Sequence, residues 1–313
     1  MLAPRTTART LGLGFLLIAF ALPGCVRNAA TGKLQFNAMS RNQEIALGLE
    51  SRPEILSAYG GEVTDPVVAE YVDEIGHKLV VHTEGDYKDL PWKFTVLNTE
   101  IINAFALPGG QVFVSRGLAE KLGSEAALAG VIGHEIGHVT AEHVDVRMGR
   151  QLILAGIAVG LSTAANQSDE KWAQSAAGLV LTGAGVYSLR FDRGQEIESD
   201  KLGMRYMYRA KYDPSALLDV MEALAHSSGG APPEFLSTHP HPETRIAKIN
   251  ERLAINPNYR ATVNNAEYGR FESRYQDRML RRLSMLGDSA HADLAMLMPD
   301  LYCGVCAARR AGR

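Results

Sequence analysis

The chain has 313 residues, of which 46% are hydrophobic and 21% are charged, and its formal net charge is −3. This composition is typical of a globular protein with enough apolar residues for a sizeable core, and the length permits one or two domains. The sequence has neither a basic stripe nor the interleaved aromatic and basic residues that mark nucleic-acid binding, so we expect no nucleic-acid partner.

Residues 1–24 have the features of a bacterial lipoprotein signal peptide. Arg5 and Arg9 give a positively charged start, and the apolar run Leu11–Leu22 that follows is too short to span a membrane comfortably. The run leads to Cys25 through a segment that resembles a lipobox, which predicts that Cys25 is lipidated and begins the mature chain. A plain secretory signal is the alternative, and both signals predict export.

The remaining cysteines agree with export. Cys303 and Cys306 are left once Cys25 is lipidated, and an even number of thiols in an oxidising compartment favours a disulfide. Idle thiols are the alternative. We expect residues 25–40 to form a tether, and we expect the lipid to anchor the protein to the outer membrane, facing the periplasm.

Two helices and a small sheet are expected after the tether. The first helix covers residues 41–59, and the second begins after Asp65, a suitable N-cap before Pro66. Residues 92–97 alternate like a strand. Residues 101–115 hold two short extended pieces separated by a Pro-Gly-Gly turn, as in a hairpin.

One edge of this sheet is a candidate substrate site, because an extended peptide can bind to a sheet edge as an additional strand. The accepting strand is formed either by Val112–Val114 or by the preceding residues Asn103, Ala104, Phe105 and Ala106. A simple hairpin without a binding role also accounts for the local pattern.

The motif H-E-I-G-H at residues 134–138 lies in a run that we predict to be helical from residue 124 to about residue 147. Residues four apart share a helix face, so His134 and His138 can direct both imidazoles at one ion. Glu135 is rotated by about 100° from His134, which directs its carboxylate at a water on that ion. The pattern favours a catalytic zinc with Glu135 as general base. Because it also occurs by chance in unrelated helices, other residues must support it.

Two apolar runs follow, at residues 152–165 and 173–186. Each is shorter than the roughly 20 residues of a membrane span. We expect a helical hairpin packed on the catalytic helices, with a hairpin that dips into the membrane as the alternative.

A second helix offers the remaining groups of a metal site. Glu196 and Asp200 are four residues apart and share a face. Glu196 can complete a His₂Glu zinc site, and Asp200 can accept the other N–H of one histidine. Glu198, on another face, is the alternative ligand. His143 is turned by about 140° from His138, so we expect it to support the site without binding the ion.

The last candidates lie beyond a Gly/Ser/Pro-rich loop. Either His239 or Arg245 would reach the zinc site and stabilise an oxyanion, and a capped loop with a surface arginine is the alternative. A helix is expected to run from Pro242 to Ala254. Residues 256–313 are expected to be an extension with one charged helix and a frayed tail.

Four separated motifs occur together in the chain: N-A-F-A-L-P-G-G, H-E-I-G-H, E-x-E-S-D-x-x-G and S-T-H-P-x-x-x-x-R-I. Over residues 25–255 the chain resembles the zinc metallopeptidases of the HtpX and CAAX-prenyl-protease type, metallopeptidase family forty-eight. The segment at residues 28–36, N-A-A-T-G-K-L-Q-F, is similar to the exported lipoprotein branch of that family. The chain departs from the family pattern at Ser199, where alanine is usual, and at Asp192, where serine commonly precedes the arginine.

The resemblance implies an α+β, mainly α, zincin-like (gluzincin) fold with a small antiparallel sheet beside the active-site helix, in a domain of residues 41–255. It implies one Zn²⁺ per chain and an endopeptidase that acts on unfolded or misfolded cell-envelope proteins. It assigns the roles of zinc ligands to His134, His138 and Glu196. It makes Glu135 the general base and Asp200 the supporting carboxylate. It places His239 and Arg245 near the reaction.

Two alternatives to an active peptidase stay open. One is a non-catalytic envelope chaperone or assembly factor that keeps the same fold. The other is a latent protease in which His239 takes the fourth zinc position.

Overall fold

The computed structural model describes residues 25–151, 190–226, 233–262 and 265–286. The expected signal peptide, both apolar runs after residue 151 and the two C-terminal cysteines lie outside these residues. Within them, no helix is both long enough and apolar enough to cross a membrane.

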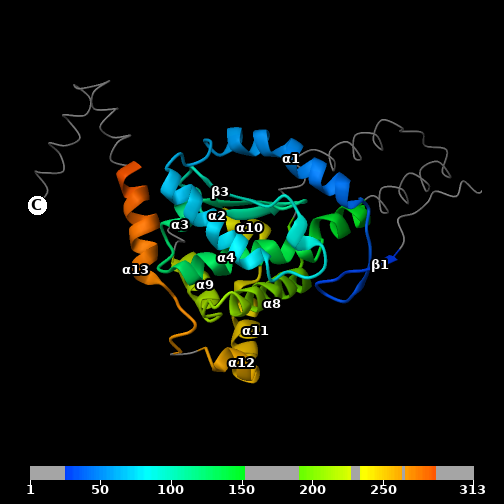
Figure 1. The fold of residues 1–313 in the computed structure, drawn as a ribbon. Coiled ribbons are helices and arrows are strands. Elements are labelled where there is room, and N and C mark those ends of the chain that lie inside the picture. Colours follow the sequence, from blue (N-terminus) through cyan, green and yellow to red (C-terminus); the bar gives the residue numbers. More distant parts are fainter. Residues whose placement is uncertain (1–24, 152–189, 227–232, 263–264, 287–313) are drawn as a thin grey trace, which may run out of the picture.

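A mixed three-stranded sheet lies at the centre of the molecule (Figure 1). It consists of β3 (Lys93–Leu97), β4 (Ala104–Leu107) and β5 (Gln111–Ser115) in the order β3-β5-β4. β4 and β5 form the predicted antiparallel hairpin, with Gly109 and Gly110 at φ 76° and 96° in its turn. The expectation of an antiparallel sheet is wrong for the second pairing. β5 returns between β4 and β3, and therefore runs parallel to β3.

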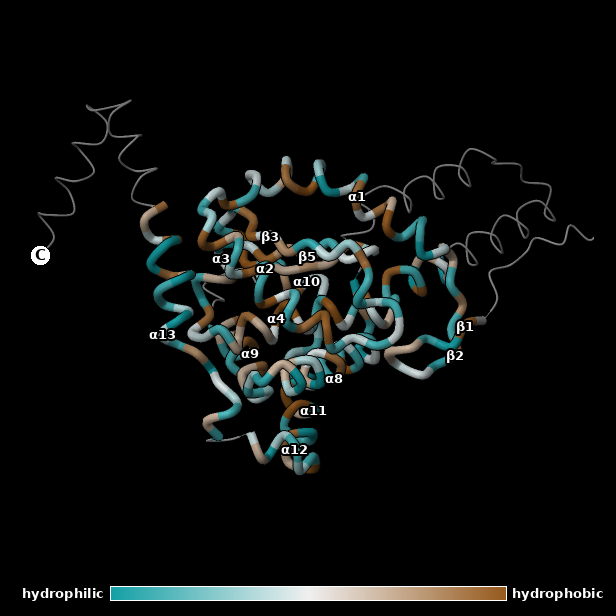
Figure 2. Tube along the Cα trace, in the orientation of Figure 1, coloured by the Kyte–Doolittle hydropathy of each residue, from teal (hydrophilic) through white to brown (hydrophobic). Residues whose placement is uncertain are grey.

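Helices cover both faces of the sheet. α1 (Arg41–Ala58) lies above it in Figure 1, and α4 (Glu125–Thr140) and α8 (Arg193–Arg209) lie below it. Alternate strand residues point to opposite faces. Phe94 and Val112 therefore join the core around α4, whereas Phe105 and Phe113 join a smaller cluster with Ile55 of α1. Figure 2 shows apolar residues concentrated in α4 and the strands, and more hydrophilic residues along the outer helices.

The predicted helix starts are confirmed. α2 (Pro66–Val80) begins after Asp65, whose side chain accepts from the backbone N–H groups of Val67 and Val68 at 2.9 and 3.2 Å. α4 begins after Ser124, whose hydroxyl accepts from the N–H of Ala127 at 3.1 Å.

The predicted continuous helix from 124 to about 147 is wrong, because it is interrupted at residues 141 and 142. Glu142 adopts φ 55°, which an α-helix cannot accommodate. Its buried carboxylate is held by the Tyr87 hydroxyl at 2.9 Å and by the Asn37 amide at 2.7 Å. Residues 143–151 are helical again, so His143 begins a new helical segment directly behind the motif.

The other named elements are β1 (Cys25–Arg27), β2 (Leu34–Phe36), η1 (Tyr87–Asp89), α3 (Arg116–Ala119), α9 (Ala216–His226), α10 (Glu234–Thr238), α11 (Pro242–Ile255), α12 (Pro257–Arg260), α13 (Glu272–Tyr275) and the π-helical η2 (Gln276–Leu280). α11 confirms the helix predicted from Pro242.

Part of the expected tether packs on the fold. β1 and β2 pair as an antiparallel hairpin. Between them, the buried Asn28 donates from Nδ2 to the carbonyl oxygen of Thr140 at 2.9 Å and to the Tyr87 hydroxyl at 2.8 Å. The hairpin therefore holds the last turn of α4.

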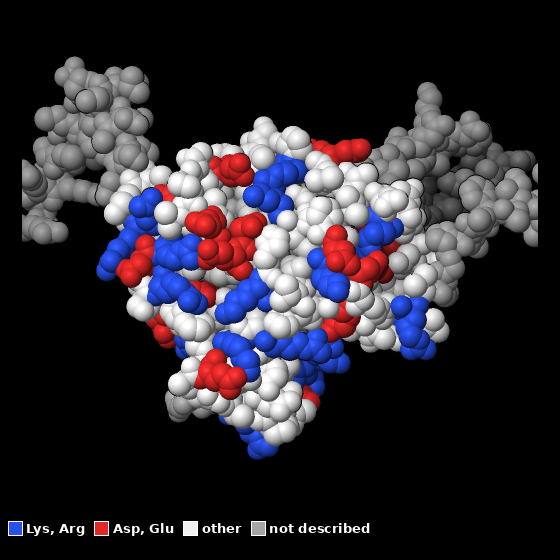
Figure 3. Space-filling view, in the orientation of Figure 1, with Lys and Arg blue, Asp and Glu red and all other residues white. Residues whose placement is uncertain are grey.

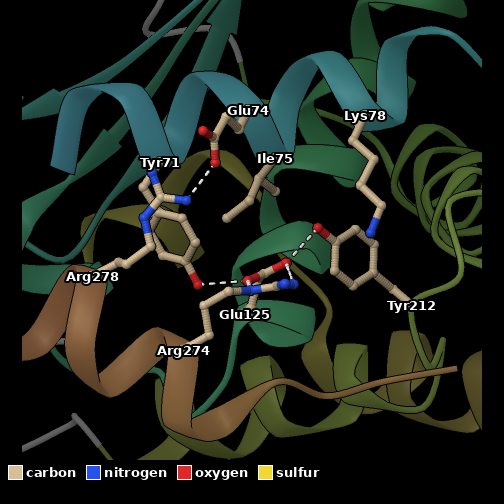
Figure 4. Close-up of a pocket in the computed structure, with 8 residues that line it drawn as sticks. All are labelled: Tyr71, Glu74, Ile75, Lys78, Glu125, Tyr212, Arg274 and Arg278. Atoms are coloured by element: carbon tan, nitrogen blue, oxygen red, sulfur yellow. Dashed lines mark hydrogen bonds and ion pairs between the residues drawn. The ribbon is translucent and has the colours of Figure 1, made fainter. Parts of the chain in front are cut away.

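Residues after 255 also contribute to the core. Tyr275 is fully buried and donates to the carbonyl oxygen of Ala119 at 2.6 Å. Arg274 forms an ion pair with Glu125, the first residue of α4, which also accepts from the hydroxyls of Tyr71 and Tyr212 at 2.7 Å each (Figure 4). α13 is therefore linked to the first turn of α4 through Arg274 and Glu125.

On the face drawn in Figure 3, acidic and basic side chains are interspersed.

Candidate metal centre

Helices α4 and α8 cross with their backbones in close contact. A Cβ atom on Gly203 would lie 3.0 Å from the carbonyl carbon of Gly133, and one on Gly137 would lie 2.7 Å from Ser199 Oγ. Ser199, which departs from the family pattern, donates its hydroxyl to the carbonyl oxygen of His134. The glycines let the H-E-x-x-H face of α4 meet the acidic face of α8.

Four side chains converge at this crossing: His134, His138, Glu196 and His239. One potential ligand atom from each lies within 4.8 Å of all the others, and all four residues are buried. His134 Nε2 lies 3.0 Å from His138 Nε2 and 3.3 Å from His239 Nδ1, and His138 Nε2 lies 3.4 Å from Glu196 Oε1.

This donor set fits a zinc ion. Tetrahedral ligands at Zn–N distances of 2.0–2.1 Å are separated from each other by about 3.3 Å, close to the separations between these atoms. Three imidazoles that direct ring nitrogens at one point are also stabilised by a cation there. The structure therefore brings together the predicted His134, His138 and Glu196, and it adds His239 to them.

Asp200 and Arg245 lie behind the cluster. Asp200 Oδ1 is 2.8 Å from His134 Nδ1, as predicted for a carboxylate that orients a histidine. Arg245 donates to both oxygens of Asp200, at 2.7 and 2.9 Å, and its Nη1 lies 2.9 Å from Glu196 Oε2. The buried guanidinium of Arg245 therefore faces these two carboxylates.

Electrostatics keep both carboxylates ionised. Burial alone would raise their pKa values. His239 and Arg245 overcome it and hold the pKa of Glu196 well below its usual value. Arg245 and His134 likewise lower the pKa of Asp200. These two buried carboxylates carry negative charge that a bound divalent cation would balance.

Glu135 has the environment of a general base. Its carboxylate is 1% exposed, and its Oε1 has no hydrogen-bond partner among the described residues. His239 Nε2 lies 3.6 Å from this oxygen. Burial raises the pKa of Glu135 above its usual value, although His239 and His134 oppose the shift. A raised pKa brings a carboxylate closer to the range in which it both takes and returns a proton.

His143 lies directly behind His138, where the sequence analysis places a supporting residue. Its Nδ1 lies 2.9 Å from His138 Nδ1, and its Nε2 lies 3.4 Å from Glu198 Oε2. Burial lowers the pKa of both histidines, that of His138 well below its ordinary value. Both rings are therefore neutral at neutral pH, the form in which an imidazole binds a metal.

Two aromatic residues of the site escaped the sequence reasoning. The ring of Phe191 lies 3.9 Å from that of His138, measured between centroids. Phe235 stacks on His239 at 4.4 Å. Their only sequence signals are position: Phe191 precedes the N-cap Asp192 of α8, and Phe235 lies one turn before His239.

The sheet offers one edge beside the cluster. β5 has strand neighbours on both sides, so Val112–Val114 cannot accept a further strand. β4 has a described strand neighbour only on the β5 side, and Ala106 of β4 lines a narrow pocket together with His138. Asn103, directly before β4, donates from its side chain to Glu234 at 2.8 Å. Of the two predicted candidates for a strand that pairs with an extended substrate, residues 103–106 therefore remain.

Comparisons with known proteins agree with this geometry. The family model described as "Peptidase family M48" matches residues 66–253. The "Beta-barrel assembly-enhancing protease" of Yersinia pestis is 32% identical over 219 residues, which cover 68% of this chain and 44% of the relative. The protein of the same name from Escherichia coli K12 is 32% identical over 61% of this chain and 40% of its own length.

Similarity extends to mitochondrial proteins. "Mitochondrial metalloendopeptidase OMA1" of Schizosaccharomyces pombe is 30% identical over 71% of this chain and 65% of its own length. The chain thus spans less than half the length of the bacterial relatives and about two thirds of the yeast one. Residues 66–253, which the family model matches, contain all four residues of the cluster.

Proposed function

Because the chain belongs to peptidase family M48, whose members depend on zinc, we propose that it is a zinc endopeptidase acting on unfolded or misfolded proteins of the bacterial cell envelope. The observation that carries this proposal is the convergence of His134, His138 and Glu196, with the buried carboxylate of Glu135 beside them. The names of the relatives, an assembly-enhancing protease and a metalloendopeptidase, support the substrate class.

In this proposal His134, His138 and Glu196 hold the ion. When bound, zinc supplies Lewis-acid chemistry that lowers the pKa of a water to about 7. Glu135 would take a proton from the attacking water and return it to the leaving amine. Asp200 fixes the ring of His134, and Arg245 fixes Asp200. His239, 3.6 Å from Glu135, is placed to donate to the oxyanion.

The substrate would bind along β4. Its backbone would pair with residues 103–106 as an added strand, which gives affinity with little dependence on side chains. Pairing of this kind requires an extended chain. It therefore favours unfolded segments over folded proteins.

The anchor at Cys25 is part of the same proposal. Asn28 is already buried in the fold, so a lipid on Cys25 would place the body of the enzyme only a few residues from the membrane. Membrane fractionation of Cys25→Ser tests this. A variant that stays membrane-bound would show that the lipid is not the anchor.

The decisive experiment compares Glu135→Gln with the wild type on unfolded casein. The variant keeps the shape of the side chain and removes the base, so we expect zinc to stay bound and cleavage to fall by about 10²–10⁴-fold. Equal cleavage by both proteins would refute the proposed mechanism.

A latent enzyme is a second candidate, favoured by the position of His239. Its Nδ1 lies 3.1 Å from Glu196 Oε1 and 3.3 Å from His134 Nε2, inside the cluster. There it could act as a fourth ligand and exclude water. If the wild type is inactive, gain of cleavage by His239→Ala supports latency, and continued inactivity supports a non-catalytic chaperone.

A further inference from the structure

Three acidic residues of α8 occupy alternate positions, and each meets a different part of the site. Glu196 lies in the cluster, and Asp200 contacts His134. Glu198, between them, points to His143. We propose that Glu198 is a positioning residue for the metal ligand His138 and that it acts through His143. This inference rests on the proposed zinc site.

The ring nitrogens define a single chain of hydrogen bonds. His138 directs Nε2 at the cluster, 3.0 Å from His134 Nε2. A neutral imidazole that binds a metal through Nε2 carries its proton on Nδ1. That proton points to His143 Nδ1 at 2.9 Å, which must therefore accept it. His143 then carries its own proton on Nε2, and this proton needs an acceptor.

Glu198 supplies that acceptor. Its Oε2 lies 3.4 Å from His143 Nε2, and its Oε1 lies 2.7 Å from Lys33 Nζ. The side chain of Glu198 is 18% exposed, whereas that of His143 is 4% exposed. An anionic acceptor holds the proton of His143 on Nε2, because a charge-assisted hydrogen bond is stronger than a neutral one.

The backbone of His143 is held by the same helix. Gln195 Nε2 donates to its carbonyl oxygen at 3.3 Å. α8 therefore fixes both the place and the tautomer of His143, and through it the ring of His138. His134 is oriented directly by Asp200, and His138 is oriented indirectly by Glu198.

Zinc affinity, measured on the full-length protein by competition with a chelator, tests this assignment. Removal of a carboxylate behind a ligand lowers metal affinity by about 10–100-fold, and we expect a loss of at least about tenfold for Glu198→Ala. Glu198→Gln keeps an acceptor oxygen but loses the charge, so its loss of affinity should be smaller than that of Glu198→Ala. Glu243→Ala, which removes an exposed acid on α11, is the matched control and should bind as the wild type does.

A double-mutant cycle separates this mechanism from a general effect of charge. If Glu198 acts through His143, then Glu198→Ala should cause no further loss in a His143→Ala background. An unchanged loss in that background would refute the proposal, and so would wild-type affinity of the Glu198→Ala single variant.

The tautomer is a second readout that requires no variant. In the zinc-loaded wild type, ¹⁵N spectra of the ring nitrogens should show His143 protonated on Nε2. Protonation on Nδ1 would refute the proposal even if Glu198→Ala does not fold. If the wild type binds no zinc, the proposed function fails and this inference fails with it. Tight zinc binding with the wrong tautomer overturns this inference alone.

Discussion

The ion pair between Arg274 of α13 and Glu125 at the start of α4 allows a quantitative prediction. Arg274→Ala leaves the carboxylate of Glu125, which is 2% exposed, without its cation (Figure 4). Loss of one partner of a buried ion pair costs about 3–5 kcal/mol. The Tyr71 and Tyr212 hydroxyls still donate to Glu125, and the Arg274 side chain is 43% exposed. We therefore expect a loss of about 2 kcal/mol in the free energy of unfolding.

Thermal and urea unfolding measure this loss. For a chain of this size, about 2 kcal/mol corresponds to a decrease of about 3 °C in Tm. Arg281→Ala is the matched control, because Arg281 lies about two helical turns beyond Arg274 in the helical residues 272–286. It pairs with Asp277 at 2.6 Å, and its side chain is 69% exposed. An exposed pair contributes about 0.5 kcal/mol or less. Equal effects of Arg274→Ala and Arg281→Ala would refute the argument that burial of Glu125 makes the first pair important.

Three further predictions follow from the site and its surroundings. Asp200→Ala should lower zinc affinity by about 10–100-fold, because His134 loses its acceptor, and unchanged affinity in a chelator titration would contradict this. Gly203→Ala should destabilise the protein by about 1–3 kcal/mol, since the added Cβ would lie 3.0 Å from Gly133, and a wild-type urea midpoint would count against the tight crossing. Burial beside two other carboxylates raises the pKa of Glu44 to about 8 against the pull of a neighbouring arginine. The folded state then holds a proton that the unfolded state releases above about pH 4.5, so this group makes stability fall between about pH 4.5 and 8. The unfolding midpoint of Glu44→Gln, relative to that of the wild type, should therefore rise as the pH rises through that window. A constant difference between the two midpoints would refute the raised pKa of Glu44.

Local signals predicted the parts of the molecule that depend on neighbouring residues in the sequence. The start of α2 follows from Asp65 and Pro66, and both hydrogen bonds of the cap form within three residues of Asp65. The pairing of His134 with His138 follows from helix geometry alone. The spacing and residue types of Glu196 and Asp200 suggested that α8 partners α4. The resemblance to a family supported this pairing, because no local rule brings two distant helices together.

Features that depend on contacts between distant parts of the chain could not be predicted from the sequence. The helix break at Glu142 depends on Asn37 and Tyr87, which are 105 and 55 residues away along the chain. Each local signal there still favours a helix. The same holds for Glu198. Its spacing on α8 marks only an acidic turn, and its contact with His143 arises because the helical segment after the break at Glu142 lies beside α8.

The hydrogen bonds that other segments make to both ends of α4 have a practical consequence for fragments of this protein. Asn28 bonds to the last turn of the helix, and the carbonyl oxygen of Arg270 accepts from the N–H of Ala126 in its first turn. Both residues lie outside residues 66–253, which the family model matches. The two ends of α4 are therefore held by residues beyond the segment that the family model matches, and we expect a recombinant piece cut at residues 66 and 253 to lose both contacts.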